Sequence, residues 1–430
     1  MTQEKSFITR NIASARKLWA SLSSSKFLVQ STSILVLSNV IVALLGLIRT
    51  TWITWIFPKN EVGMIGVVTS WLPFIQIISM SGIDTAAYHY VTKGHKNAFI
   101  AGVRQRFLWS LLGCLAFCLG AVYWFLSDSP DLGWLFLVAA ISYPFTYALS
   151  ASPGYLGSQG LFSGLFWYRI GESLTDFAGF LPVLLSVIWI NRITTFYSTN
   201  QFATALMQVT VTVVLIRQIK KIVSVPLPAD EQKKMFTYGR HLTALTGIGV
   251  LQSKTDAFLV AALQPLETVA DYSIALIIQE QLRRLWGIFS TLRYPVLVQL
   301  PEHTRRKRFI LEGALLLCTL SLAALVISIL AFWLIPIILP KNYSPSLNYM
   351  VVLLGATLAG TPGGLVEMYY RTMEDAKHQY WMRTFGAIVG VILPTLLVIK
   401  FGAFGAAVGR MLANLLFSLF GLGLFFGRHP

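Results

Sequence analysis

Charged side chains inside long apolar stretches are the residues of this sequence best suited to chemistry. Inserting a charged side chain at the centre of a membrane costs about 2.5–3.5 kcal/mol on insertion scales, so each such residue is a candidate for a functional role. The cations are Arg49, Lys254, Arg283, Arg284 and Arg410, and the anions are Asp176, Asp256 and Glu280. Five positive charges against three negative ones favour an anionic ligand such as a phosphate, which arginine binds through its planar fork. We expect these cations to bind substrate.

Helical spacing offers some of these ions a local partner instead. Glu280 precedes Arg283 and Arg284 by three and four residues, so it can neutralise one arginine and leave the other free. Glu172 and Asp176, four residues apart, repel each other unless one is protonated, which suits ion coupling or gating. The alternative for Glu172 is a solvated side chain at a helix end.

A weak internal repeat relates two of the ions. Residues 254–294 contain an apolar helix, the turn QPLETVAD and a returning helix; a shift of 207 positions aligns Arg49 with Asp256. Carriers commonly build a central site from duplicated hairpins. We expect Arg49 and Asp256 to meet in an outer gate, unless each is paired within its own half, Asp256 with Lys254 for example. Arg410 either binds substrate or donates to carbonyl groups of a broken helix.

The composition predicts that these residues lie in a membrane. Of 430 residues, 55% are hydrophobic and only 12% are charged, and the mean hydropathy is +0.65. Soluble domains carry about 25% charged residues. Apolar runs of the length that a bilayer requires recur along the whole chain. The fold class is therefore an all-α polytopic membrane protein.

We place twelve transmembrane helices in this sequence. They lie near 30–56, 63–87, 107–126, 132–153, 170–190, 197–216, 240–263, 269–294, 309–339, 347–368, 383–399 and 403–426. The expected domains are a basic segment 1–26 that forms an interfacial helix, a six-helix lobe 27–216, a cytoplasmic linker 217–239 and a second six-helix lobe 240–430. The motif 360–364 contains proline and three glycines, which indicates either a break in its helix or a kink that fits packing.

The connectors between these helices alternate in charge. One set carries most of the basic residues, whereas the other holds only Lys59, Arg192, Lys341 and Lys400. Cytoplasmic loops accumulate Lys and Arg, so both termini are expected in the cytoplasm. Membrane orientation also explains the net charge of +16 without a nucleic-acid partner.

Other reactive side chains give no sign of catalysis. Cys114, Cys118 and Cys318 lie in apolar runs, where small-hydrophobe roles are favoured over a disulfide or a metal site. The six histidines lie mostly in connectors or at helix ends, without metal-ligand spacing. Glu367 and Arg371 are interpreted as a surface pair. We expect no enzymatic activity, no metal and no cofactor beyond a coupling ion, H+ or Na+.

Four features together resemble the multidrug/oligosaccharidyl-lipid/polysaccharide exporter superfamily, and within it the O-antigen and polysaccharide-repeat flippases. One is the six-plus-six arrangement with both ends inside. The others are the motifs PKNEVG at 58–63, SGIDTA at 81–86 and GAFGAA at 402–407. The resemblance covers nearly the whole chain.

The resemblance implies two pseudo-symmetric lobes around a central lumen in a bacterial inner membrane. It also implies a substrate, an undecaprenyl-diphosphate-linked oligosaccharide that alternating access moves to the periplasmic leaflet, and other polysaccharide-assembly membrane proteins as partners. The alternative within the superfamily is an ion-coupled multidrug exporter. Such exporters usually carry an acidic residue in the first span, where this chain has Arg49 instead.

Overall fold

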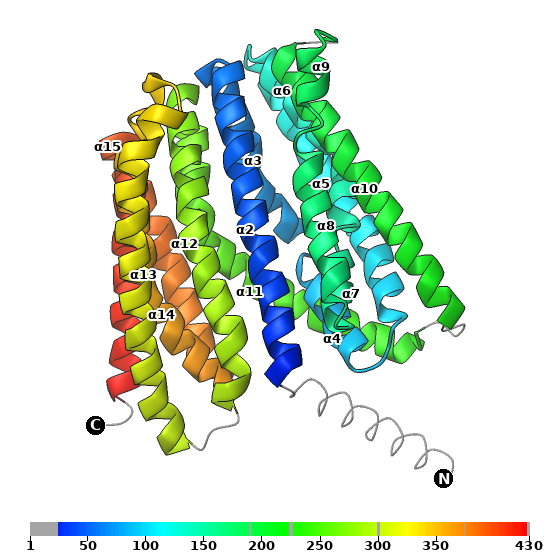
Figure 1. Ribbon diagram of the computed structural model, residues 1–430, viewed down its shortest axis with the longest axis vertical. Coiled ribbons are helices and arrows are strands. Elements are labelled where there is room, and N and C mark those ends of the chain that lie inside the picture. The colour runs from blue at the N-terminus through cyan, green and yellow to red at the C-terminus, as the bar shows by residue number, and fades with distance from the viewer. Residues whose placement is uncertain (1–24, 189–190, 223–226, 299–301, 374, 428–430) are drawn as a thin grey trace.

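The chain folds into two bundles of long helices that stand side by side (Figure 1). The computed structural model describes residues 25–188, 191–222, 227–298, 302–373 and 375–427, and all regular structure within these ranges is helical. The interfacial helix predicted for the first 26 residues falls almost entirely outside the described residues. The start of α2 and the end of α15 lie at the same end of the molecule, the lower one in Figure 1.

The first lobe is built from the N-terminal half of the chain. Its helices are α2 (Ser25–Ile56), α3 (Lys59–Ile78), α4 (Gly82–Thr92), α5 (Ala98–Leu126), α6 (Pro130–Ala148), α7 (Ser152–Ser158), α8 (Phe162–Thr175), α9 (Phe180–Leu184) and α10 (Arg192–Ile222). Three pairs of consecutive helices, α3 with α4, α6 with α7 and α8 with α9, are each separated by only a few residues. Each pair therefore forms one interrupted crossing.

The second lobe has fewer interruptions. It contains α11 (Ala229–Leu263), α12 (Leu266–Val298), α13 (Glu302–Ile338), the short 3₁₀ helix η1 (Lys341–Tyr343), α14 (Ser346–Thr372) and α15 (Ala376–Gly427). The long helix α15 folds back at Gly402, whose φ of 62° and ψ of −149° suit glycine alone. Its two arms are separate crossings.

The described helices bear out the membrane fold. Eight segments are long and apolar enough to span a bilayer, and the α15 segment, with 51 residues, counts twice because it folds back at Gly402. The more polar crossings α8 with α9, α11 and α12 complete the twelve predicted helices. Large apolar side chains face outward, and Leu126, Ile337 and Ile399 are 80%, 73% and 73% exposed. Such exposure is costly in water and favourable in lipid.

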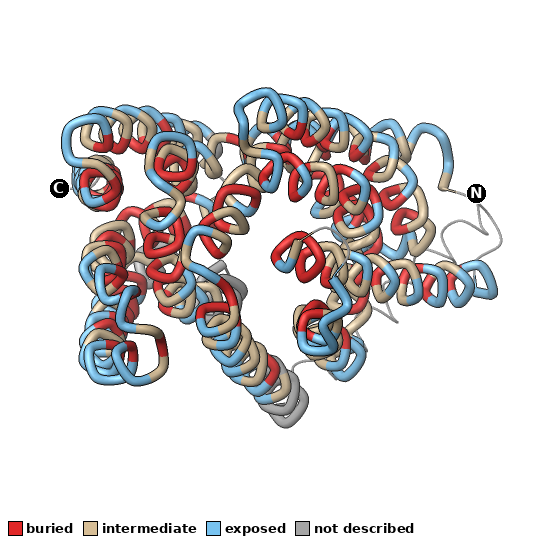
Figure 2. The backbone as a smooth tube through the Cα atoms, turned by 90° about the horizontal axis from the view of Figure 1, so that it is seen from above, coloured by how far each residue is buried: buried red, intermediate tan, exposed pale blue. Residues whose placement is uncertain are grey.

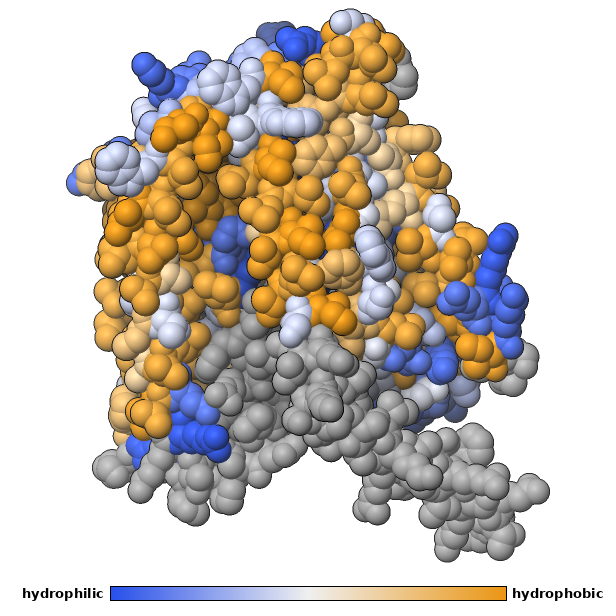
Figure 3. Space-filling model, in the orientation of Figure 1, coloured by the Kyte–Doolittle hydropathy of each residue, from blue (hydrophilic) through white to orange (hydrophobic). Residues whose placement is uncertain are grey.

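Figure 2 shows buried residues along the faces where neighbouring helices meet and exposed residues around the perimeter. Figure 3 shows the corresponding belt of apolar side chains, with hydrophilic side chains at the two ends. A few hydrophilic side chains also show in a recess within the belt. The polar interior that the deep ions require is therefore enclosed by an apolar exterior.

The structure adds detail to two local expectations, and for the motif 360–364 it excludes the first of the two alternatives. The motif 360–364 does not break its helix, since α14 continues through Pro362, and the backbone N–H of Gly363 donates to Ser418 Oγ at 2.9 Å. The predicted linker 217–239 is helical at both ends, where it forms the last turn of α10 and the start of α11. Residues 223–226 between them lie outside the described part.

The lobes contact each other through α3 and α12 in the upper half of Figure 1, and α11 of the second lobe also packs against α3 and α4 of the first. A Cβ atom at Gly63 would collide with the carbonyl oxygen of Leu266, and one at Gly66 would come within 2.5 Å of Ser273 Oγ. Gly66 and Ser273 are also equivalent positions in the 207-residue repeat. A two-fold axis that related the two repeats would therefore pass close to this contact.

Candidate functional site between the lobes

Two cavities lie against the interface between the lobes. The lower cavity, of about 570 Å³, is lined mainly by α11, α12, α14 and α15, with Pro73 and Gln76 of α3. The upper cavity, of about 370 Å³, is lined by α2, α3, α11 and α12. Lys254 and Pro73 line both cavities. Lys254 is therefore a cation that groups in either cavity can reach.

Helical periodicity explains which side chains line the lower cavity. On α12 the lining residues are Gln279, Arg283 and Trp286, which lie on one helix face because they are spaced four and then three residues apart. On α15 the residues Arg410 and Asn414 have the same i, i+4 relation. The facing surface of α14 is made mostly of glycine and threonine residues, which leaves space between the helices.

Lys254, Glu280 and Arg283 form a charge cluster where the two cavities meet. Glu280 Oε2 is 4.0 Å from Lys254 Nζ and 3.8 Å from Arg283 Nη1. Each of the three side chains keeps between 34% and 42% of its surface exposed. Two cations and one carboxylate leave one positive charge over, and these open side chains can add an anionic ligand without burying a new unpaired ion.

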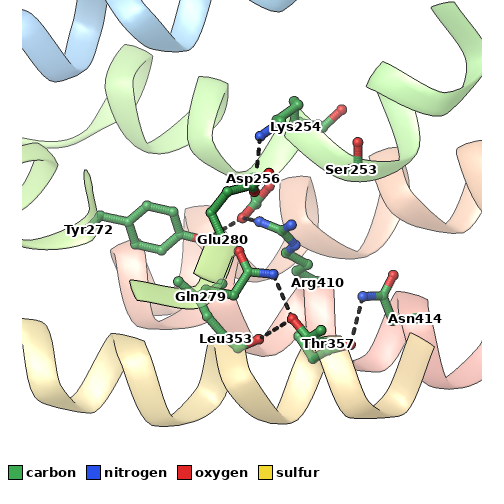
Figure 4. A network of polar contacts seen from close by, with 12 residues as sticks. Ser253, Lys254, Asp256, Tyr272, Gln279, Glu280, Leu353, Thr357, Arg410 and Asn414 are labelled. Carbon is green, nitrogen blue, oxygen red and sulfur yellow. Dashed lines mark hydrogen bonds and ion pairs between the residues drawn. The ribbon is translucent and has the colours of Figure 1, made fainter. Parts of the chain in front are cut away.

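Asp256 and Arg410, by contrast, form a closed pair. Asp256 Oδ2 accepts a 2.9 Å hydrogen bond from Arg410 Nη1 and a 2.5 Å hydrogen bond from the Tyr272 hydroxyl (Figure 4). The side chains of Asp256 and Arg410 are only 2% and 5% exposed. The expected gate between Arg49 and Asp256 is therefore wrong for this conformation, since each ion is paired within its own lobe. The expectation that Arg410 donates to backbone carbonyls is replaced by this pair with Asp256.

In the first lobe, Arg49 lines the upper cavity and its Nη1 lies 3.4 Å from Asp176 Oδ2. Glu172, the predicted partner of Asp176 in ion coupling, accepts a 3.3 Å hydrogen bond from Gln208 Nε2. The two acids of this i, i+4 pair thus have different neighbours. Their mutual repulsion is reduced because the negative charge of Asp176 is paired with Arg49.

Arg284 is exposed and is not among the residues that line either cavity. It points to another side of α12 than Arg283 because consecutive helical residues lie about 100° apart. It comes close enough to Arg169 of α8, in the other lobe, for the two positive charges to repel. Arg169 itself donates to Asn39 Oδ1 at 3.1 Å.

Several lining residues of the lower cavity were missed by the sequence analysis. Gln279 Nε2 donates to Thr357 Oγ1 at 2.7 Å, and Asn414 Nδ2 donates to the Ala356 carbonyl at 2.8 Å (Figure 4). Gln252 and Trp286 line the same cavity. The available signal was the spacing of these polar and aromatic residues along the helix faces that carry the ions.

Glu367 is more than the expected surface pair. It accepts hydrogen bonds from Arg371 at 3.3 Å and from Arg383 of α15 at 2.7 Å, and both Glu367 and Arg383 line the lower cavity. The cavity thus has a second set of ions, on the side away from Lys254. Among the described residues, no group of three or more His, Cys, Asp or Glu side chains is arranged to hold a metal ion.

Above the upper cavity, polar contacts join the two lobes. Lys59 Nζ donates to Asp271 Oδ2 at 2.7 Å and to the Asn342 carbonyl at 2.6 Å. Trp55 Nε1 donates to the Ile338 carbonyl at 2.6 Å. The Lys59 and Asp271 side chains are only 12% and 6% exposed. We call these contacts of Trp55, Lys59 and Asp271 the upper latch.

The sequence matches the family described as polysaccharide biosynthesis protein over residues 28–301. No curated protein matches it. Solved structures that resemble it include the lipid II flippase MurJ in an inward closed conformation, with 14% identity and a TM-score of 0.61 over 91% of this chain and 87% of that one.

Two further structures are MATE transporters. An inward-facing multidrug resistance MATE family transporter of the MOP superfamily has 11% identity and a TM-score of 0.64, over 90% of this chain and 94% of that one. A mutant of the Vibrio cholerae MATE transporter VcmN has 13% identity and a TM-score of 0.57, over 94% and 96% of the two chains. These likenesses confirm the two-lobed twelve-helix fold.

Proposed function

The chain belongs to the polysaccharide biosynthesis protein family, and from this premise we propose that it is a flippase for a lipid-linked oligosaccharide. Its substrate is an undecaprenyl-diphosphate-linked repeat unit, which it moves from the cytoplasmic to the periplasmic leaflet for the assembly of a surface polysaccharide such as O-antigen. The observation that carries the proposal is the open cluster of Lys254, Glu280 and Arg283, with its surplus positive charge beside both cavities.

The diphosphate binds Lys254 and Arg283 in this mechanism. A diphosphate is strongly anionic, and charge-assisted hydrogen bonds from arginine to phosphate are roughly twice as strong as neutral ones. Glu280 holds the two cations near each other while the site is empty. Arg284 and Arg169 supply further positive charge along the path by which the diphosphate enters between the lobes. An anion between these two arginines relieves their mutual repulsion.

Alternating access follows from the position of the upper latch. With the latch closed, the substrate enters from the lower, cytoplasmic side, which the accumulated basic residues favour as the inner face. Breaking the latch and closing the lower side releases the substrate to the other leaflet. Asp176, which faces Arg49, and Glu172 are the groups to which a coupling ion, H+ or Na+, would bind.

The proposal is tested by lipid translocation in proteoliposomes. Replacing both Lys254 and Arg283 with Gln removes two charge-assisted contacts of about 1.5–3 kcal/mol each, so the translocation rate of labelled undecaprenyl-diphosphate oligosaccharide should fall by more than ~100-fold. The matched control replaces Lys400 and Arg217, which are exposed and outside the cavities, with Gln.

Unchanged translocation by the Lys254 and Arg283 variant would remove the cluster from the mechanism. If the wild-type protein moves no lipid-linked sugar but expels a cationic dye, the chain is a multidrug exporter instead.

A further inference from the structure

We propose that the lower cavity contains a carbohydrate subsite, formed by Gln252, Gln279, Trp286 and Asn414, which selects substrates by the sugar attached to the diphosphate. This inference rests on the proposed flippase function and adds a selectivity that the charge cluster alone does not provide. Lys254 and Arg283 recognise the diphosphate, which every lipid carrier of this class shares. Discrimination between carriers with and without a sugar needs other groups.

The side chains that line this cavity suit a sugar ring. Sugar hydroxyl groups both donate and accept hydrogen bonds, and amide side chains can pair with them in both directions. The C–H faces of the ring are apolar and pack against aromatic rings such as that of Trp286. The cavity volume of about 570 Å³ also lies in the ~300–1,000 Å³ range of small-molecule sites.

Two of the amides are held in a fixed orientation before any ligand binds. Gln279 donates to Thr357 Oγ1 at 2.7 Å, and Thr357 in turn donates to the Leu353 carbonyl at 3.1 Å. Asn414 donates to the Ala356 carbonyl at 2.8 Å. Within the described part of the chain, the amide oxygens of Gln279 and Asn414 have no hydrogen-bond donor. They remain as acceptors for ligand hydroxyl groups.

Glycines of α14 provide the space for such a ligand. A Cβ atom at Gly360 would lie 3.2 Å from Asn414 Cγ, and one at Gly364 would lie 3.4 Å from Trp286 Cζ2. Any longer side chain at these two positions would project into the cavity or displace the residues of the subsite. The width of the subsite is therefore set by glycine.

The spacing along α12 places the subsite beside the diphosphate cluster. Arg283 and Trp286 lie on the same face of the helix, separated by a rise of ~4.5 Å. A sugar ring linked to a diphosphate at Lys254 and Arg283 reaches the indole of Trp286 without further extension. Gln279 lies on the same face, on the other side of Arg283.

The test compares two lipids in proteoliposomes of the full-length protein. The first kind of lipid is undecaprenyl diphosphate without a sugar. The second kind is a panel of undecaprenyl diphosphates, each of which carries a single hexose or N-acetylhexosamine. Trp286→Ala should slow the preferred glycosylated lipid about tenfold, which corresponds to ~1.4 kcal/mol of lost interaction, and leave the sugar-free lipid unchanged. Trp286→Phe should retain most of the activity because it keeps an aromatic face.

Two further variants separate this role from a general structural one. Gly364→Leu should fill the subsite and produce the same selective loss, so it tests the proposal even if Trp286→Ala does not insert. Trp333→Ala is the matched control, because Trp333 is 67% exposed on α13 and outside the cavity. Lys254→Gln should slow both lipids equally, since both carry the diphosphate.

Each other outcome overturns the inference. An equal loss for both lipids, or no loss for either, in Trp286→Ala and Gly364→Leu excludes the carbohydrate subsite. Equal wild-type rates for the sugar-free lipid and for every glycosylated lipid also exclude it but leave the flippase function intact. Failure of the wild type to move any of these lipids refutes the proposed function, and the subsite with it.

Discussion

The deep ions of this protein have two different kinds of surroundings. Lys254, Glu280 and Arg283 are partly exposed to the cavities and have cationic charge in excess. Asp256 and Arg410 are almost completely buried and neutralise each other. A buried ion pair is weak evidence for stability in itself, but it is expensive to break. The first set is therefore suited to a ligand, and the second to fixing α11 against α15.

Breaking the buried pair should destabilise the protein. Asp256→Asn leaves Arg410 without its carboxylate, and a loss of about 3–5 kcal/mol is typical for one partner of a buried pair. The double variant Asp256→Asn, Arg410→Gln should be more stable than the sum of the single changes, because it leaves no unpaired ion. Thermal unfolding in detergent measures both effects.

Arg371 supplies the control, because its side chain is 49% exposed and Glu367 keeps its contact with Arg383, so Arg371→Gln should cost no more than ~1 kcal/mol. Strictly additive changes in the double variant would contradict the pairing of Asp256 with Arg410. Arg49 and Asp256 are paired with different residues, so a double variant that exchanges their charges should not restore the transport lost in the single charge-reversal variants.

The sequence was sufficient to find these ions but not to pair them. Hydropathy places Lys254 and Asp256 at nearly the same depth, but two residues apart on a helix they point about 200° away from each other. Only one of them can face Arg410, and the rotation of α11 decides which one. That rotation depends on packing against several other helices, which a single sequence does not determine.

At the scale of elements, the contact between α3 and α12 is the one that can be related to the internal repeat of the sequence. The repeat aligned Gly66 with Ser273, and the structure brings these two residues into contact. The breaks after α3 and α8 were not predicted, because hydropathy continues through them. At the first break Met80 has a φ of 59°, which is uncommon for a residue with a side chain.

Gly63→Ala should therefore disturb the contact between the lobes. The added methyl group meets the backbone oxygen of Leu266, which cannot move aside, and overpacking of this kind costs about 1–3 kcal/mol. Gly46→Ala in α2 is the matched control, because nothing lies within 4 Å of its added Cβ atom. There, alanine should be neutral or stabilise the helix by about 0.5–1 kcal/mol.

Thermal unfolding and translocation should both be measured for this pair of variants. Equal behaviour of Gly63→Ala and Gly46→Ala would show that α3 and α12 are farther apart in the membrane than they are here.

At the scale of the whole molecule, the upper latch joins the two lobes at their upper ends. Lys59 and Asp271 belong to different lobes, and both are largely buried. The loss of one partner therefore destabilises the latched state but leaves each lobe intact. A change of ~3 kcal/mol shifts a two-state equilibrium by more than 100-fold.

Asp271→Asn should thus open the upper side. A cysteine at Thr69, an exposed residue lining the upper cavity, should react with a membrane-impermeant thiol reagent at least tenfold faster in the Asp271→Asn background. Lys341→Gln is the control, because it removes a nearby exposed lysine that is not part of the latch. The exchange Lys59→Asp, Asp271→Lys should partly restore protection. No change in labelling would mean that other contacts keep the upper side closed.

The contact between Gly66 and Ser273 has a mechanical consequence if the lobes rock against each other there. Ser273 lies ~10 Å along α12 from its upper end at Leu266, but ~20 Å from Trp286 in the lower cavity. A body that turns about a fulcrum moves in proportion to the length of each arm. A rotation that separates the upper ends of the lobes by a given distance therefore displaces the walls of the lower cavity about twice as far. The opening on the lower side is then wider than the opening on the upper side.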